Sequence, residues 1–242
     1  MNSDKIFLEL KRISKRLAAD CSALHFGPQI AAVYNPLEYA WRPHNMYLKL
    51  AGSSQKKVIF MGMNPGPWGM AQTGVPFGEI SIVRDWLGIE AVVDKPEKEH
   101  PKRPIEGFSC TRSEVSGRRL WGLFRERYKK PEKFFIDHFV GNYCPLVFME
   151  ESGANVTPDK LPMDEAAPLY KICDSALAEI INVLKPQWVI GIGGFAKKRI
   201  DKLPATGFAT GQILHPSPAS PKANAGWDKE AIKTLVELGI WQ

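Results

Sequence analysis

The sequence has no run of about 18 consecutive apolar residues, the length that a membrane-spanning helix needs. Its first twenty residues, MNSDKIFLELKRISKRLAAD, also lack the continuous apolar core of a secretory signal peptide. Charged and apolar residues alternate there at helical spacing instead. We therefore expect no contact with a membrane, and a cytoplasmic protein.

Closely spaced cysteines are missing as well. No two of the four cysteines lie near enough in the sequence to form a CxxC pair, which disfavours a zinc site or an iron–sulfur cluster. We expect no metal and no cofactor, and reduced thiols with a structural role. The four are Cys21, Cys110, Cys144 and Cys173.

Two phosphate-binding signatures are absent from the glycine-rich stretch GMNPGPWGM (62–70). No Gly-Lys-Ser/Thr follows it, so it is not a P-loop. Pro65 and Pro67 lack the backbone amides with which a dinucleotide fingerprint holds phosphates. The prolines instead fix the backbone around Asn64, and Gly66 lets a flat ligand approach the main chain. An equal alternative is a stiff connection in which Asn64 caps its own turn.

Length and charge set broad limits. The 242 residues suit one domain with a sizeable core, which we place over residues 1–242. The net charge of +6, from 32 Lys+Arg against 26 Asp+Glu, is compatible with a nucleic-acid partner. It is weak evidence, because many proteins without such a partner are equally basic.

Apolar periodicity predicts an amphipathic helix over residues 5–19. Ser116 is a plausible N-cap for another helix, which ends at Tyr128. The charged, proline-containing segment 94–104 is expected to be a surface loop. The other predicted helices cover 80–87, 164–184 and 228–238, with a short basic helix after Gly193-Gly194.

Short apolar runs predict four strands, at 57–61, 134–140, 188–192 and 211–214. Strands that alternate with helices predict an α/β fold with a mostly parallel sheet covered on both faces. A distinctive loop follows each strand: GMNPG, GNYCP, GIGGF and HPSP. In a parallel sheet these loops gather at the carboxyl ends of the strands, where such folds bind ligands.

Three further residues in these regions could carry chemistry. Phe77, between Pro76 and Gly78, could stack on a planar base, although most phenylalanines belong to the core. Asn142 offers the donors and acceptor needed to read the edge of a base, although an amide that ties the loop together is the simpler interpretation. His215 begins the rigid HPSPASP loop (215–221), a better catalytic setting than a lone histidine usually has.

Together these motifs resemble the uracil-DNA glycosylase superfamily, and within it the single-strand-selective monofunctional branch. The resemblance runs from about Tyr34 to the C-terminus. GMNPGPWGMAQTGVPFGE is similar to the first active-site motif, HPSPASP to the second, and GNYCPLVFM to the intervening strand and loop. The resemblance implies a three-layer α/β/α fold with a short, mainly four-stranded parallel sheet.

It also implies excision of uracil from DNA by hydrolysis of the N-glycosidic bond, without strand cleavage. Asn64 would place the attacking water, and His215 would stabilise the departing uracil anion at O2. Asn142 would read the N3 and O4 edge, and Phe77 would stack on the flipped base. Met63 and Gly66 would shape the pocket, which would also admit 5-hydroxymethyluracil.

The HPSPASP loop is where the sequence departs from this resemblance. Animal members carry an arginine there that probes the DNA stack, whereas this chain has Ala219 followed by Ser220. We expect a weaker wedge, or Lys222 in its place. The residues expected to contact DNA are Pro216, Ser217, Pro218, Ala219, Ser220 and Lys222.

Two other functions stay open at this point. The chain could be a glycosylase for another deaminated base, such as xanthine or hypoxanthine, or a non-catalytic binder of single-stranded DNA. The expected partner in each case is DNA, single- or double-stranded, bound by a monomer. The compartment would be the cytoplasm, at the nucleoid, in a bacterium or the nucleus in a eukaryote.

Overall fold

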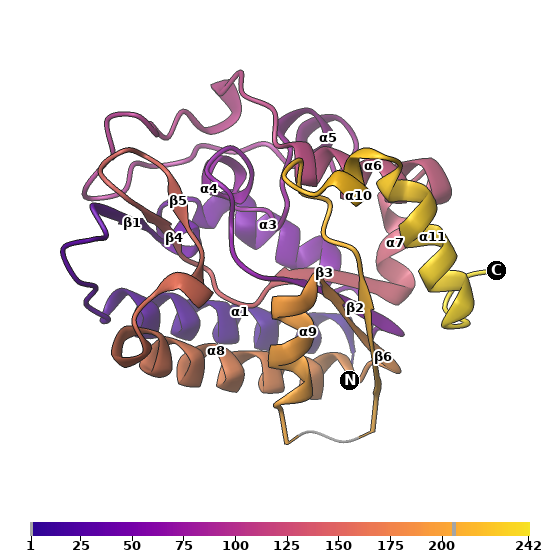
Figure 1. The fold of residues 1–242 in the computed structure, drawn as a ribbon. Helices are drawn as coiled ribbons and strands as arrows, with labels where there is room; N and C mark the ends of the chain where they lie inside the picture. The colour runs from indigo at the N-terminus through magenta and orange to yellow at the C-terminus, as the bar shows by residue number, and fades with distance from the viewer. Residues whose placement is uncertain (1, 205–206) are drawn as a thin grey trace.

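A four-stranded parallel sheet in the order β3-β2-β6-β7 forms the centre of the computed structural model, which describes residues 2–204 and 207–242 (Figure 1). Every residue of β2 is buried, as a strand in the middle of a sheet covered on both faces requires. The predicted parallel central sheet is confirmed. Its strands are β2 (Val58–Gly62), β3 (His138–Asn142), β6 (Trp188–Ile192) and β7 (Ala209–Ile213).

Helices cover both faces of this sheet. On one face Tyr47 packs against Phe139 of β3, with ring centres 6.1 Å apart. On the other, Phe124 packs against Phe60 of β2 at 5.2 Å. The three-layer α/β/α architecture is therefore confirmed. The first face carries α1 (Ser3–Ser22), α3 (Trp41–Ala51), α8 (Met163–Leu184) and α9 (Gly194–Asp201), and the second carries α6 (Val115–Tyr128) and α11 (Trp227–Glu237).

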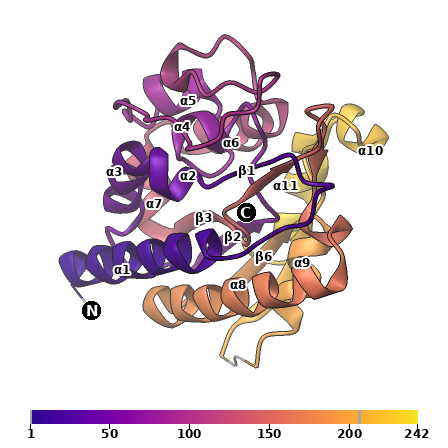
Figure 2. The same cartoon turned by 90° about the vertical axis from the view of Figure 1, so that its left-hand side faces the viewer.

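The predicted N-terminal helix is confirmed and is slightly longer than expected. Asn2 caps it by accepting a hydrogen bond from the Lys5 backbone N–H at 3.0 Å. Its apolar stripe is buried, and Arg16 on its polar side forms an ion pair with Glu179 of α8. Figures 1 and 2 both show α1 and α8 lying side by side.

The predicted strand over 134–140 is wrong in its first half. Residues Pro131–Asp137 form α7, with Pro131 in the first turn, where a missing N–H costs nothing. Phe134 and Phe135 are fully buried, and Phe134 stacks on Phe124 with ring centres 4.5 Å apart. A short apolar run fits a buried helix as well as a strand, so periodicity could not separate the two. β3 begins at His138 and ends at Asn142, which was expected to lie in the loop after the strand.

The expected N-cap of α6 is also wrong. Glu114 occupies that position, and its carboxylate accepts a hydrogen bond from the Ser116 backbone N–H at 3.3 Å. The remaining helix predictions are confirmed within a few residues, including α5 (Ile80–Asp85). Segment 94–104 contains neither helix nor strand, as predicted.

Several elements were not predicted. A second, antiparallel sheet in the order β1-β4-β5 lies beside the main one, and short helices fill the connections. These elements are β1 (Ala32–Tyr34), β4 (Val147–Met149), β5 (Asn155–Val156), α2 (Pro36–Tyr39), α4 (Met70–Thr73), α10 (Pro221–Asn224) and the 3₁₀ turns η1 (Gly107–Ser109) and η2 (Pro158–Lys160).

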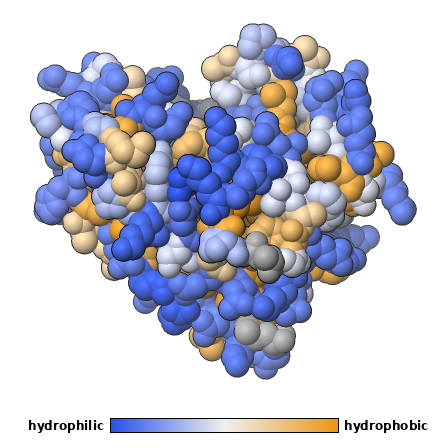
Figure 3. Space-filling model, turned by 60° about the horizontal axis from the view of Figure 1, so that its bottom comes forward, coloured by the Kyte–Doolittle hydropathy of each residue, from blue (hydrophilic) through white to orange (hydrophobic). Residues whose placement is uncertain are grey.

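No helix in residues 2–204 and 207–242 is long and apolar enough to cross a membrane. The face of the molecule seen in Figure 3 is mostly hydrophilic, with apolar side chains scattered in small patches. That face presents no broad apolar band to a partner.

Candidate active site

The loops at the carboxyl ends of the parallel strands enclose one cavity of about 690 Å³. This is the place that the sheet topology predicts for a ligand. Most of the predicted site residues line it together: Met63, Asn64, Gly66, Phe77, Asn142, His215, Ser217, Pro218, Ala219 and Ser220. Two do not, because Pro216 is buried behind the loop and Lys222 is exposed on α10.

Asn64 is held by one half of its amide. Its Nδ2 donates to the Leu146 backbone carbonyl at 3.1 Å, and a longer contact of 3.4 Å reaches Pro65 O. Since the donor side is anchored, Oδ1 is left to accept a hydrogen bond from something within the cavity. The arrangement combines both interpretations of this residue, because the side chain braces the loops and still presents an acceptor.

Asn142 carries an unsatisfied hydrogen-bond acceptor in the cavity. Among the described residues, its buried Oδ1 has no hydrogen-bond partner, and its Nδ2 contacts only the Met70 sulfur, at 3.4 Å. An unsatisfied buried acceptor costs about 1–3 kcal/mol, so folding alone does not favour it. A ligand with a donor beside an acceptor would satisfy both ends of this amide.

His215 lies two residues after the end of β7 and packs against Gly193. Gly193 has a φ of +89°, and a Cβ added there would be 3.1 Å from His215 Cβ, so only glycine fits without a shift. Burial lowers the pKa of His215 below its usual value, which keeps the imidazole neutral at pH 7. A neutral imidazole at the cavity wall can donate one hydrogen bond to a ligand oxygen.

Phe77 lies in the cavity wall and is almost completely buried. The residue is 9 % exposed, and its ring centre is 6.2 Å from that of His215. Its φ of +55° is uncommon for a bulky residue, and such strain persists only where the surroundings enforce it. The ring also packs closely on the backbone of Gly62, where an added Cβ would come within 2.5 Å of it.

Gly66 is required by a neighbour that sequence reasoning missed. A Cβ added to it would lie 2.5 Å from Glu114 Oε2, so the glycine lets this carboxyl pack against the loop. Burial raises the pKa of Glu114. Glu114 thus caps α6 and lines the cavity at the same time.

One arginine holds the HPSPASP loop in place. Arg119 of α6 donates to the carbonyls of Pro216 and Ser217 at 3.0 and 3.4 Å, and to Asn224 Oδ1 of α10 at 2.9 Å. Asn224 in turn donates to Pro218 O at 2.9 Å. The exposed tip of the loop, Pro218 and Ala219, is therefore presented from a fixed base.

Metal ligands do not gather in this region. Across residues 2–204 and 207–242, no group of three His, Cys, Asp or Glu side chains could hold a metal ion. All four cysteines are free and buried. Hydrogen bonding with Cys144 and Cys21 raises the pKa of the Cys173 thiol.

The sequence profile of the Uracil DNA glycosylase superfamily matches residues 51–236, which include every strand of the parallel sheet and both motifs. The chain belongs to this superfamily.

Named members of the uracil-DNA glycosylases are close to the chain over most of its length. It is 48 % identical over 228 residues to the single-strand selective monofunctional uracil-DNA glycosylase of Rattus norvegicus, covering 93 % of this chain and 82 % of that one. The Bos taurus protein of the same name is 47 % identical, covering 93 % and 84 %. The crystal structure of Pedobacter heparinus SMUG2 superposes with a TM-score of 0.61 at 13 % identity, covering 94 % and 97 %, and supports the fold alone.

Sequence analysis did not predict three of the residues that line the cavity of this superfamily member. Asn155 and Thr157 reach it from β5 and the turn after it, and Glu114 reaches it from the start of α6. Asn155 belongs to the small antiparallel sheet that the apolar pattern did not indicate. The only sequence signal for Glu114 was its position as a polar residue just before a helix. Ser116 was preferred as the N-cap because serine is the more common residue there.

Proposed function

We propose that this chain is a monofunctional uracil-DNA glycosylase that hydrolyses the N-glycosidic bond of uracil in DNA and leaves an abasic site for base-excision repair. The observation that carries the proposal is the cavity in which Asn64, Asn142 and His215 meet Phe77. The membership of the superfamily and the names of the relatives support it. No lysine lines the described cavity to attack the sugar, so water is the nucleophile.

Recognition of the base follows from the unsatisfied amide of Asn142. The N3–H of a flipped uracil would donate to the buried Oδ1, and Nδ2 would donate to O4. Phe77 would stack on the face of the base, a contact worth about 1–3 kcal/mol. Met63 and Gly66 complete the pocket wall in this proposal. The base must leave the DNA stack to reach these groups.

Hydrolysis separates charge, since the sugar becomes cation-like while uracil leaves as an anion. His215 in its neutral form would donate to O2 of the departing base, a hydrogen bond that strengthens as the charge grows. Asn64 Oδ1 would hold the attacking water, because the Leu146 carbonyl fixes the opposite end of the amide. Each group then acts on one side of the bond that breaks.

The loop tip formed by Ser217, Pro218, Ala219 and Ser220 would enter the space that the flipped nucleotide leaves. Ala219 is short, which favours substrates whose base is already unstacked, as in single strands. Pro216 and Lys222 take supporting positions, as a buried anchor and an exposed cation on α10. The protein would act as a single domain and a monomer, in the compartment that holds the DNA, on single- and double-stranded substrates.

The test uses oligonucleotides that carry one uracil, 5-hydroxymethyluracil, xanthine or hypoxanthine. Strand cleavage is measured with and without alkali, which breaks the chain only at abasic sites. We expect cleavage of the uracil and 5-hydroxymethyluracil strands after alkali and intact strands without it. Excision of xanthine or hypoxanthine in preference to uracil would contradict the proposal, as would binding with no excision at all.

A further inference from the structure

Two arginines converge on one tryptophan beside the cavity. The guanidinium carbon of Arg103 lies 5.2 Å from the centre of the Trp68 ring, and that of Arg112 lies 5.4 Å from it. Trp68 belongs to the GMNPGPWGM loop and lines the cavity. Arg112 is exposed, and Arg103 and Trp68 are half-buried, so the group faces solvent at the cavity mouth. We call these three residues the Arg–Trp–Arg platform.

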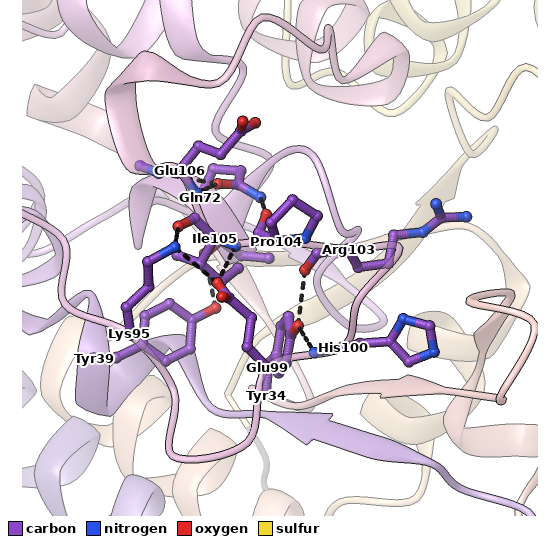
Figure 4. Close-up of polar contacts among 12 residues, drawn as sticks. Tyr34, Tyr39, Gln72, Lys95, Glu99, His100, Arg103, Pro104, Ile105 and Glu106 are labelled. Carbon is purple, nitrogen blue, oxygen red and sulfur yellow. Dashed lines mark hydrogen bonds and ion pairs between the residues drawn. The ribbon is translucent and has the colours of Figure 1, made fainter.

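The platform is held in place from below by a single buried glutamine. Gln72 of α4 is fully buried, and its Nε2 donates to Pro67 O at 3.1 Å and to Pro104 O at 3.0 Å. Its Oε1 accepts from the backbone N–H groups of Glu106 and Gly107. One side chain therefore ties the loop that carries Trp68 to the segment that carries Arg103 (Figure 4).

The segment around Arg103 is braced on its other side as well. Tyr34 donates to the Arg103 carbonyl at 2.8 Å and accepts from the His100 backbone N–H at 2.6 Å. Figure 4 shows the Arg103 side chain extending away from this cluster. The backbone is thus fixed, while the guanidinium donates only to the adjacent Lys102 carbonyl, at 2.9 Å, among the described residues. Its other N–H groups are left for a contact outside the chain.

The platform lacks a counter-charge. Among the residues that the structure describes, neither Arg103 nor Arg112 forms an ion pair, and Arg103 Nε is buried without a partner. The indole attracts both cations, but it does not neutralise them. Two unneutralised guanidiniums on a fixed base suit an anion with several oxygens, which accepts charge-assisted hydrogen bonds from both.

We propose that the Arg–Trp–Arg platform binds the phosphodiester backbone of the DNA strand whose nucleotide enters the cavity. The inference rests on the proposed function, because the cavity next to it then holds a nucleotide with phosphates on both sides. A phosphate fits better than a nucleobase here, since stacking on Trp68 would compete with both arginines for the ring. The contact does not depend on the DNA sequence, and it adds a second DNA-binding site to that formed by the HPSPASP loop.

The test measures binding of a single-stranded oligonucleotide that contains 2′-fluoro-2′-deoxyuridine. The glycosidic bond of this nucleotide resists hydrolysis because the fluorine destabilises the cation-like sugar. The dissociation constant is measured by fluorescence anisotropy over a series of salt concentrations. Arg103→Gln and Arg112→Gln are each expected to make the slope of log affinity against log salt shallower by about 0.7, and the double variant by about 1.4. Arg112 makes no side-chain hydrogen bond in the described structure, so its variant should fold normally.

Two controls make the result specific. Arg125→Gln removes the same charge from an exposed position on α6. This position lies about 16 Å along the helix from Glu114, which lines the cavity, so the slope should stay unchanged. Arg103→Lys and Arg112→Lys keep the charge and should keep most of the slope. Equal slopes for the double glutamine variant and the unchanged protein would overturn the proposal, and so would an equal loss in the lysine variants.

The proposed function is tested separately on the same strand with ordinary deoxyuridine. Release of uracil by the unchanged protein with no slope change in the variants would refute the platform alone. Absence of uracil release by the unchanged protein would refute the proposed function instead.

Discussion

Asn142 is the residue at which the demands of folding and of function differ most. Its buried Oδ1 has no partner within the described chain, so the folded protein carries a cost of about 1–3 kcal/mol there. Buried polar groups without partners are uncommon, and one inside a cavity is best explained by a ligand that supplies the partner. The free energy lost in folding would then be recovered when uracil binds.

This argument gives a prediction with opposite signs for stability and activity. Asn142→Ala removes the unsatisfied acceptor beside an open cavity, so the free energy of unfolding should stay unchanged or rise by up to about 1 kcal/mol. Uracil excision under single-turnover conditions should fall roughly 10- to 100-fold, since both hydrogen bonds to the base are lost. Urea unfolding and a quenched-flow assay measure the two effects. A less stable variant with normal excision would mean that Asn142 has a structural role.

His215 is expected to act mainly on the transition state. His215→Ala should lower the single-turnover rate by about 10²–10³ and change DNA binding far less, because the bond to O2 strengthens only as the anion forms. The loss should be smaller for 5-fluorouracil, which leaves more easily. A structural histidine would slow both bases alike and lower the unfolding temperature.

The pKa of His215 adds a pH test. Burial lowers this pKa below its usual value, so the neutral imidazole predominates at pH 7 and above. The excision rate should therefore show no inflection from this residue between pH 7 and 8.5. An inflection near pH 7 that disappears in His215→Ala would contradict the neutral form.

At the scale of elements, α6 links three parts of the site. Glu114 at its start packs on the GMNPG loop, and Arg119 one turn later fixes the HPSPASP loop and α10. The orientation of this one helix therefore decides how the two motifs face each other. Phe124 then anchors the helix on β2.

Arg119→Ala should loosen the base of the HPSPASP loop. Under the proposed function the loop enters the DNA stack on duplex substrates but meets an unstacked base on single strands, so the effect of disorder should depend on the substrate. We expect kcat/KM to fall about tenfold on duplex DNA, from the loss of charge-assisted hydrogen bonds, and less than threefold on single strands. Arg118→Ala, an exposed neighbour on the same helix, is the matched control. Equal losses on both substrates would show that the Arg119 hydrogen bonds have no role in opening the duplex.

The sequence predicted the elements that have strong local patterns. The helix at the N-terminus was found because its apolar residues recur at helical spacing. The strands at 57–61 and 188–192 were found because each is a short apolar run that ends at a glycine-containing loop. The start of α7 was missed because Phe134 and Phe135 fit either structure, and tertiary packing decided between them. The antiparallel sheet was missed because its strands are two or three residues long.

The candidate site was predictable to the same extent. Asn64, Asn142 and His215 each follow or end a parallel strand, so topology alone brings them to one edge. The contributions of Glu114, Asn155 and Thr157 depend on how distant segments pack, which no local pattern encodes. The Arg–Trp–Arg platform belongs to the same class, because Gln72 joins two loops that lie more than thirty residues apart.

For the whole molecule, buried histidines make stability depend on pH. Burial lowers the pKa of His44 and of His138 to about 4. Each ring is neutral in the folded state and has the usual pKa near 6.5 when unfolded, so the unfolded state binds more protons in acid. Their stabilisation is complete above pH 6.5 and is lost as the pH falls toward 4.

We expect each histidine to lower the free energy of unfolding by roughly 3 kcal/mol between pH 6.5 and pH 4. That is a large part of the total stability of an ordinary domain, so the protein should unfold in mild acid. Urea unfolding at a series of pH values measures the dependence. His44→Gln should remove about half of it, and a variant with the full dependence would show that other groups cause it.

The central claim is that one cavity both binds uracil and hydrolyses its glycosidic bond with a water held by Asn64. The most direct measurement is the single-turnover release of uracil from a single-stranded oligonucleotide by the unchanged protein and by Asn64→Ala, with Asn182→Ala, an asparagine on the distant α8, as control. We predict release by the unchanged protein and the control, an intact strand until alkali is added, and a rate at least about 100-fold lower in Asn64→Ala with nearly unchanged DNA affinity. Release of uracil by Asn64→Ala at the rate of the unchanged protein, or strand cleavage without alkali, would contradict this account.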